Sequence, residues 1–101
     1  MITTQQQPAI SAITHIELLS NKNIPLAEWN QLQGFISIAL VYSLKSRIVQ
    51  QTIALCQQHK LKAPDAIIAA TALVHNLELI TRNLTDFKNI PALSLIDPHT
   101  L

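Results

Sequence analysis

Residues 62–72 read Lys-Ala-Pro-Asp-Ala-Ile-Ile-Ala-Ala-Thr-Ala and carry the strongest structural signal in the sequence. Pro64 suits the first turn of a helix, where the carboxylate of Asp65 would meet the positive helix end. Residues 66–74 are almost wholly apolar, and their small alanine side chains let a helix lie close against a sheet. Asn76 is expected to end this helix in the left-handed conformation. The stretch therefore predicts a buried helix that begins beside an acidic group.

Short apolar runs and helical segments alternate on both sides of this helix. Downstream, residues 77–81 and 93–96 are typical of strands, and 83–89 is expected to be a loop or a single helical turn. Upstream, we expect a strand within 9–14 and then a short helix to Leu19, capped by Thr14 and Glu17. A helix over 25–36 and a strand at 38–42 that is buried on both faces are expected next. The last upstream element is a helix that begins at Ser43 or Lys45 and buries Cys56. Such alternation predicts an α/β fold with a mainly parallel sheet.

The length of 101 residues sets one domain as the ceiling, with residues 1–8 expected as a disordered stretch and 9–101 as the domain. Gly34 is the only glycine, which excludes glycine-rich phosphate-binding loops. The net charge of +1 is too small to indicate a nucleic-acid-binding surface. No apolar run reaches the roughly 18 residues of a membrane span, and residues 1–8 do not resemble a signal peptide. We therefore expect a cytoplasmic protein.

Three of the six acidic residues stand where a metal site could form. Glu17 follows the first expected strand, Asp65 opens the buried helix, and Asp86 follows the strand at 77–81. Ligand sites in parallel sheets lie outside the carboxyl ends of the strands, and clusters of carboxylates suit Mg²⁺ or Mn²⁺. Each acid also has a structural interpretation, since Glu17 could complete a capping box, Asp65 could favour the helix end and Asp86 could cap a turn.

Four segments, in order and spacing, resemble VapC-type members of the PIN domain family. Residues 62–72 resemble the family's Pro-Asp-Ala helix, and residues 79–87, Leu-Ile-Thr-Arg-Asn-Leu-Thr-Asp-Phe, resemble its Thr-Arg-Asn/Asp-x-x-Asp-Phe segment. Residues 90–98 resemble the closing strand, and residues 10–18 the strand that leads to the second acid. The resemblance covers about 9–98 and implies a metal-dependent ribonuclease, commonly a toxin neutralised by an antitoxin and commonly a dimer.

The resemblance also assigns roles to individual residues. It implies that Glu17, Asp65 and Asp86 are catalytic acids that bind Mg²⁺ or Mn²⁺. Asn83 and Thr81 would orient water or ligands around them by hydrogen bonding. The remaining assignment concerns Arg82, which would face solvent and could meet a phosphate of an RNA substrate.

The sequence departs from the family pattern at its start. Family members begin with a strand that ends in an Asp-Thr/Ser-Asn type motif, whose Asp is a main metal ligand. No Asp or Glu precedes Glu17 here. The expected fold is thus a PIN-like three-layer fold in which the first strand and first helix are absent, and the expected ribonuclease activity is impaired.

Three hypotheses follow. The chain is a VapC-like endoribonuclease toxin whose missing acid is supplied by an upstream segment or a partner chain. Alternatively, it is a catalytically inactive remnant that binds an antitoxin or a second PIN subunit. The third hypothesis is an unrelated α/β domain with coincident motifs.

Overall fold

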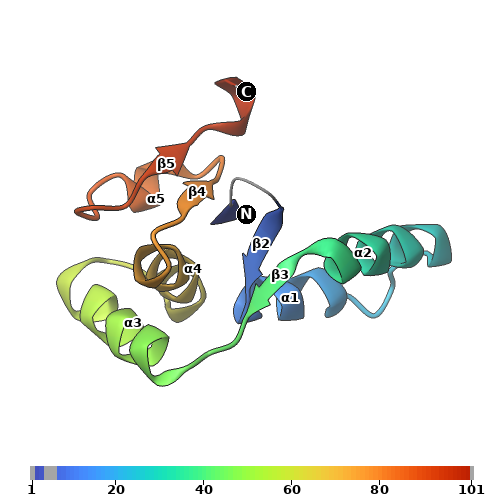
Figure 1. Ribbon diagram of the computed structural model, residues 1–101, viewed down its shortest axis with the longest axis horizontal. Helices are drawn as coiled ribbons and strands as arrows, with labels where there is room; N and C mark the ends of the chain where they lie inside the picture. Colours follow the sequence, from blue (N-terminus) through green and yellow to red (C-terminus); the bar gives the residue numbers. More distant parts are fainter. Residues whose placement is uncertain (1, 4–6, 101) are drawn as a thin grey trace.

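The computed structural model describes residues 2–3 and 7–100, and within them a five-stranded sheet has the order β3-β2-β1-β4-β5. The strands are β1 (Ile2–Thr3), β2 (Pro8–Ser11), β3 (Leu40–Tyr42), β4 (Glu78–Ile80) and β5 (Leu95–Ile96). The helices are α1 (Ala12–Leu19), α2 (Leu26–Ile38), α3 (Ser46–Gln58), α4 (Ala63–Val74), α5 (Leu84–Phe87) and a final 3₁₀ turn, η1 (Pro98–Thr100). Figure 1 shows α3 and α4 on one side of β2 and β3 and the pair α1 and α2 on the other. The α/β prediction is confirmed.

Strand β1 joins two parallel pairs of strands. β2 runs parallel to β3, and β4 runs parallel to β5. β1 is antiparallel to both β2 and β4, with Ile2 opposite Ala9 and Leu79. The other four strands therefore share one direction, as a mainly parallel sheet requires. The middle of the sheet holds a strand of two residues that runs the opposite way.

The prediction of a disordered stretch over residues 1–8 differs from the structure at three positions. Ile2 and Thr3 form β1, and Pro8 begins β2. Residue 1 and residues 4–6 lie outside the described part of the chain. The short strand was missed because two residues carry no detectable alternation of apolar and polar side chains.

The buried helix α4 has the predicted form. It spans Ala63–Val74, with Pro64 and Asp65 in its first turn. Asn76 has a φ of 53°, the left-handed conformation expected at this helix end. The buried side chains of α4, a helix that packs against α3, β2 and β4, are small; they belong to Ala66, Ala69, Ala70, Thr71 and Ala72. The alanines let this helix approach the sheet closely, as the sequence predicted.

The predicted start of helix α1 was wrong by three residues. Ser11, not Thr14, caps the helix, because its Oγ accepts a hydrogen bond from the backbone N of Thr14 at 3.2 Å. Residues 12–14 are therefore helical, and β2 ends at Ser11. Glu17 consequently does not complete a capping box with Thr14. Ser11 and Thr14 are both good capping residues, and a local pattern does not separate them.

Two burial predictions were also wrong. β3 lies at the edge of the sheet, and Leu40 and Val41 are exposed rather than buried on both faces. Cys56 is an exposed free thiol, and the buried residues of α3 are Ile48 and Leu55. The strand expected over 38–42 is shorter, since Ile38 ends α2 and β3 spans only Leu40–Tyr42. In both cases the position of the segment in the sheet or on the helix decides which side chains are covered.

The helices α1 and α2 and the strand β3 form a projection, here called the apolar arm. Figure 1 shows the arm extending away from α3, α4 and α5. Neither α1 nor α2 contains a buried residue. The arm has six large exposed apolar side chains: Ile16, Leu26, Trp29, Ile38, Leu40 and Val41. In the described part of the chain, no helix is long and apolar enough to cross a membrane.

Candidate functional site

The turn between β4 and α5, together with α5 itself, holds three hydrogen-bonded residues that the sequence singled out. The backbone N of Asn83 donates a hydrogen bond to Thr81 Oγ1 at 3.0 Å. Its side-chain Nδ2 donates to Asp86 Oδ2 at 2.7 Å. Such short-range bonds from Thr and Asn side chains are typical of tight turns. They hold the exposed carboxylate of Asp86 close to the end of β4.

Arg82 lies in the same turn with its side chain exposed. This agrees with the expectation that Arg82 faces solvent. Its contact with an RNA phosphate stays a prediction.

The other two acids come from different helices. Asp65 lies in the first turn of α4 and is partly buried. Glu17 lies near the end of α1 and is exposed. Both helices pack against each other and, through β2, against the same sheet. The fold thus distributes the candidate acids over α1, α4 and α5.

These acids do not assemble into one group of ligands. Among residues 2–3 and 7–100, no three His, Cys, Asp or Glu side chains are arranged so that they could hold a metal ion. The structure does bring Asp86 together with Asn83 and Thr81. The metal-binding and catalytic roles of Glu17, Asp65 and Asp86 stay predictions.

A second group of polar side chains lies at the start of α3, where the sequence indicated no site. Lys45, Arg47 and His75 line adjoining hollows there, and the ring of His75 stacks on that of Tyr42 with centroids 4.0 Å apart. The two cations are close in sequence, but His75 follows them by almost thirty residues. The Lys-Ser-Arg spacing at a helix start was a signal for this cluster, although the position of His75 depends on the pairing of α3 with α4.

Comparisons with known proteins agree with the resemblance found in the sequence. The model of the PIN domain family matches residues 3–93. A chain of a toxin–antitoxin complex from Klebsiella pneumoniae is 40% identical, with a TM-score of 0.76, over 91% of this chain and 74% of that one. The comparison with curated proteins found no match.

Two further solved structures share the fold. A chain of VapBC2 from Rickettsia felis, bound to a fragment of promoter DNA, is 26% identical over 89% of this chain and 74% of that one, with a TM-score of 0.77. A chain of DNA-bound VapBC from Salmonella typhimurium is 28% identical over 88% and 74%, with a TM-score of 0.74. The family match and these structures together identify the family of the sequence. The chain belongs to the PIN domain family and is of the VapC type.

Proposed function

We propose that this chain is the toxin subunit of a toxin–antitoxin pair and carries part of a Mg²⁺- or Mn²⁺-dependent endoribonuclease site. The observation that carries the proposal is the placement of three acids, in the order expected from the resemblance, on α1, α4 and α5. The similar chains from Klebsiella pneumoniae and Salmonella typhimurium belong to toxin–antitoxin and VapBC complexes. The substrate proposed is RNA, and the proposed location is the cytoplasm.

The acids of the described residues do not fit a complete centre for a divalent ion. Carboxylate oxygens are suitable ligands for Mg²⁺ or Mn²⁺. However, no three of the acids lie together, and Asp86 is hydrogen-bonded to Asn83 instead. We propose that an acid from an upstream segment or from a partner chain completes the set, and that the 101 residues alone cleave RNA poorly.

The second candidate function is a binding module that pairs with an antitoxin or with a second copy of the chain. The apolar arm favours it. Its side chains include Leu26, which is 74% exposed, and Ile38, which is 63% exposed. Leaving such side chains in water costs roughly 25 cal/mol for each Å² that a partner could cover. Large contiguous apolar surfaces on soluble proteins usually mark interfaces. We propose that a protein partner covers the arm.

Replacing Trp29 with alanine tests the apolar arm as the antitoxin site. Tryptophan side chains are frequent energetic centres of interfaces, and losing one costs about 2 kcal/mol or more, which is a roughly 30-fold loss of affinity. The antitoxin of the Klebsiella pneumoniae complex is the probe, and binding is measured by calorimetry. Val49→Ala on α3, an exposed apolar residue outside the arm, is the matched control and should change the affinity by less than about twofold.

The opposite pattern would place the antitoxin elsewhere. If Val49→Ala weakens binding and Trp29→Ala does not, the arm is not the antitoxin site. Measuring the oligomeric state of Trp29→Ala in the absence of antitoxin shows whether a second copy covers the arm instead.

A further inference from the structure

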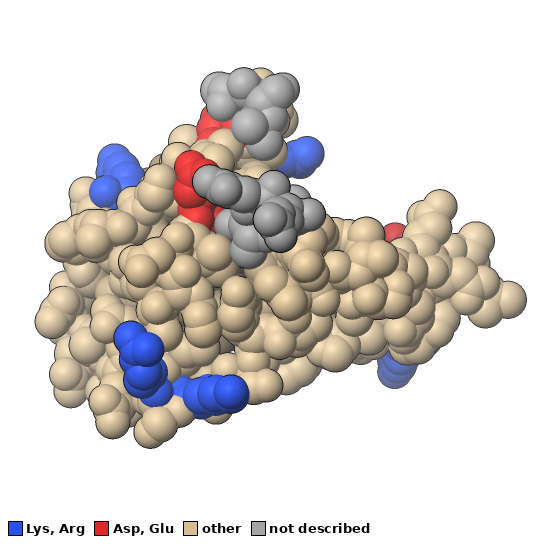
Figure 2. All heavy atoms as spheres, viewed as in Figure 1, with Lys and Arg blue, Asp and Glu red and all other residues tan. Residues whose placement is uncertain are grey.

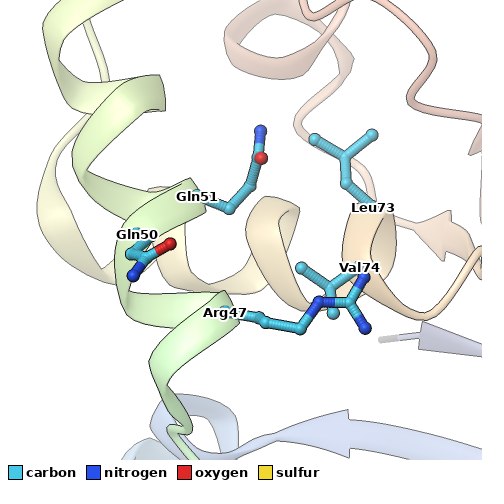
Figure 3. Close-up of a pocket in the computed structure, with 5 residues that line it drawn as sticks. All are labelled: Arg47, Gln50, Gln51, Leu73 and Val74. Atoms are coloured by element: carbon cyan, nitrogen blue, oxygen red, sulfur yellow. The ribbon is translucent and has the colours of Figure 1, made fainter.

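Three adjoining hollows surround the start of α3 and the end of α4. The first, about 350 Å³, is lined by Arg47, Gln50 and Gln51 of α3 and by two apolar residues of α4. In Figure 3 the side chain of Arg47 extends from α3 across to Val74, and Gln51 points into the space between the two helices. The second hollow, about 280 Å³, shares Arg47 and Val74 with the first. The first two hollows therefore adjoin at the positively charged side chain of Arg47.

The third hollow, about 210 Å³, extends the same region to β3. It shares Lys45 and His75 with the second hollow and adds Tyr42. The rings of Tyr42 and His75 stack with an interplanar angle of 24°. We call the whole depression the basic groove and define it by Tyr42, Lys45, Arg47, Gln51 and His75.

Positive charge in the basic groove is not balanced by acidic side chains in its walls. Among the described residues, none that lines the three hollows is Asp or Glu. The first turn of α3 also contains no acid, so its positive helix end adds to the same field. Partial desolvation lowers the pKa of His75 from its ordinary value, and the charges of Arg47 and Lys45 lower it further. Figure 2 shows blue basic side chains over the start of α3 at the lower edge of this face.

The basic groove lies at the opposite end of α4 from Asp65. Ten residues separate Asp65 from His75, which corresponds to about 15 Å along a helix. A stacked nucleic-acid strand rises about 3.4 Å for each nucleotide, so roughly four nucleotides would cover this distance. An RNA of ten nucleotides would reach both places at once.

We propose that the basic groove binds a backbone phosphate of single-stranded RNA, several nucleotides away from Asp65 at the start of α4. The inference rests on the proposed function and adds the place where the substrate is held. Lys45 and Arg47 would bind the phosphate, because charge-assisted hydrogen bonds are the strongest contacts that a phosphate can receive.

The chemistry of the walls favours RNA over an acidic peptide. Both ligands would satisfy the two cations. Only a nucleotide also offers a flat base to the aromatic pair of Tyr42 and His75, a contact worth about 1–3 kcal/mol for each base. The amide of Gln51 can hydrogen-bond to a base edge or a ribose hydroxyl.

The test compares two double variants of the 101-residue chain in binding a fluorescent RNA decamer without divalent ions. Lys45→Ala/Arg47→Ala removes both groove cations, and Lys22→Ala/Lys60→Ala removes two exposed charges elsewhere. The groove variant should bind about tenfold more weakly at low salt. Its slope of log K against log salt should be smaller by about 0.7, because one neutralised phosphate contributes roughly this much for single strands. In the control variant, the changes in binding free energy and in the salt slope should each be no more than about a third of those in the groove variant.

His75 supplies a second measurement that a purely structural role would not affect. The groups that face it are Tyr42, Lys45 and Arg47. A bound phosphate stabilises the imidazolium form, so the pKa of His75 should rise when the decamer binds, as followed by NMR of the ring protons. The folded state of each variant is checked by circular dichroism before binding is measured.

Several results would overturn the proposal. Equal losses of affinity for the decamer in both double variants would mean that RNA is attracted to positive charge anywhere on the surface. Equal affinity for inorganic phosphate and for the decamer would assign the groove to a small anion. Tighter binding of a polyglutamate peptide than of RNA, lost in the groove variant, would assign it to an acidic protein segment. Because no metal is added, failed binding here is separate from failed cleavage, and the antitoxin experiment is independent of both.

Discussion

Cleavage of single-stranded RNA by the 101-residue chain in Mn²⁺ is expected to stay close to the rate without protein. Efficient enzymes accelerate reactions by about a millionfold or more. Metal-dependent phosphodiester cleavage depends on carboxylates that fix the ions on the attacking and leaving oxygens. No three acids of the described residues form such a group. The chain should therefore lack most of the acceleration that an assembled site would give.

Two substitutions make this prediction specific. Asp65→Asn should leave the residual rate within about twofold of the unmodified chain, and so should the control Glu28→Gln, which removes an exposed acid from α2. Cleavage is followed with a quenched fluorescent RNA. A large Mn²⁺-dependent rate that Asp65→Asn abolishes and Glu28→Gln does not would contradict the incomplete site. If a chain extended by an upstream acidic segment shows such a rate, the extension has supplied the missing ligand.

Replacing Leu79 with alanine is expected to lower the free energy of unfolding by about 2–5 kcal/mol. Leu79 in β4 is 0% exposed and lies in the core with Ala9, Phe87 and Ile90. The residue is paired with both β1 and β5, so it lies on an interior strand of the sheet. Its truncation leaves a cavity that the surrounding backbone is too constrained to fill. Domains of this size are marginally stable, so this loss is a large part of the total.

The matched control is Leu26→Ala on the apolar arm. Leu26 is 74% exposed, so its truncation should change the free energy of unfolding by less than about 0.5 kcal/mol. Urea unfolding followed by circular dichroism gives both values. Equal destabilisation by the two variants would mean that the arm is covered in solution or that β4 is not the centre of the core.

The sequence predicted best the elements whose pattern is local and long. The helix over Ala63–Val74 has a proline and an acid in its first turn, a run of alanines and a terminal asparagine. Each of these signals comes from the chemistry of a single segment. The turn after β4 was also predictable, because Thr81, Asn83 and Asp86 interact within six residues.

Features that depend on distant segments were not predictable. The apolar run that contains Leu40 and Val41 reads like a buried strand, but the order of the sheet places it at the edge. Ser11 and Thr14 compete as helix caps, and the pairing of Ser11 with Tyr42 keeps Ser11 in the strand. The same reasoning applies to the basic groove, which depends on how α3 packs against α4.

The acids show why order along the chain does not determine a site. Glu17, Asp65 and Asp86 lie in this order on α1, α4 and α5. A metal centre also needs their oxygens to converge around one point. The middle of the sheet is held by Ile2–Thr3, which runs antiparallel to both neighbours. No acid from this strand joins the others, since none precedes Glu17.

Titrating the 101-residue chain with Mn²⁺ shows whether its acids form an incomplete metal site, because the titration measures metal binding without requiring catalysis. Electron paramagnetic resonance of free Mn²⁺ gives the dissociation constant for the unmodified chain, Asp65→Asn and Asp86→Asn. The incomplete site predicts binding on the order of millimolar that neither substitution weakens by more than about twofold. Binding that is about a hundredfold tighter, and that both substitutions abolish, would contradict it, because such affinity requires the acids to act on one ion.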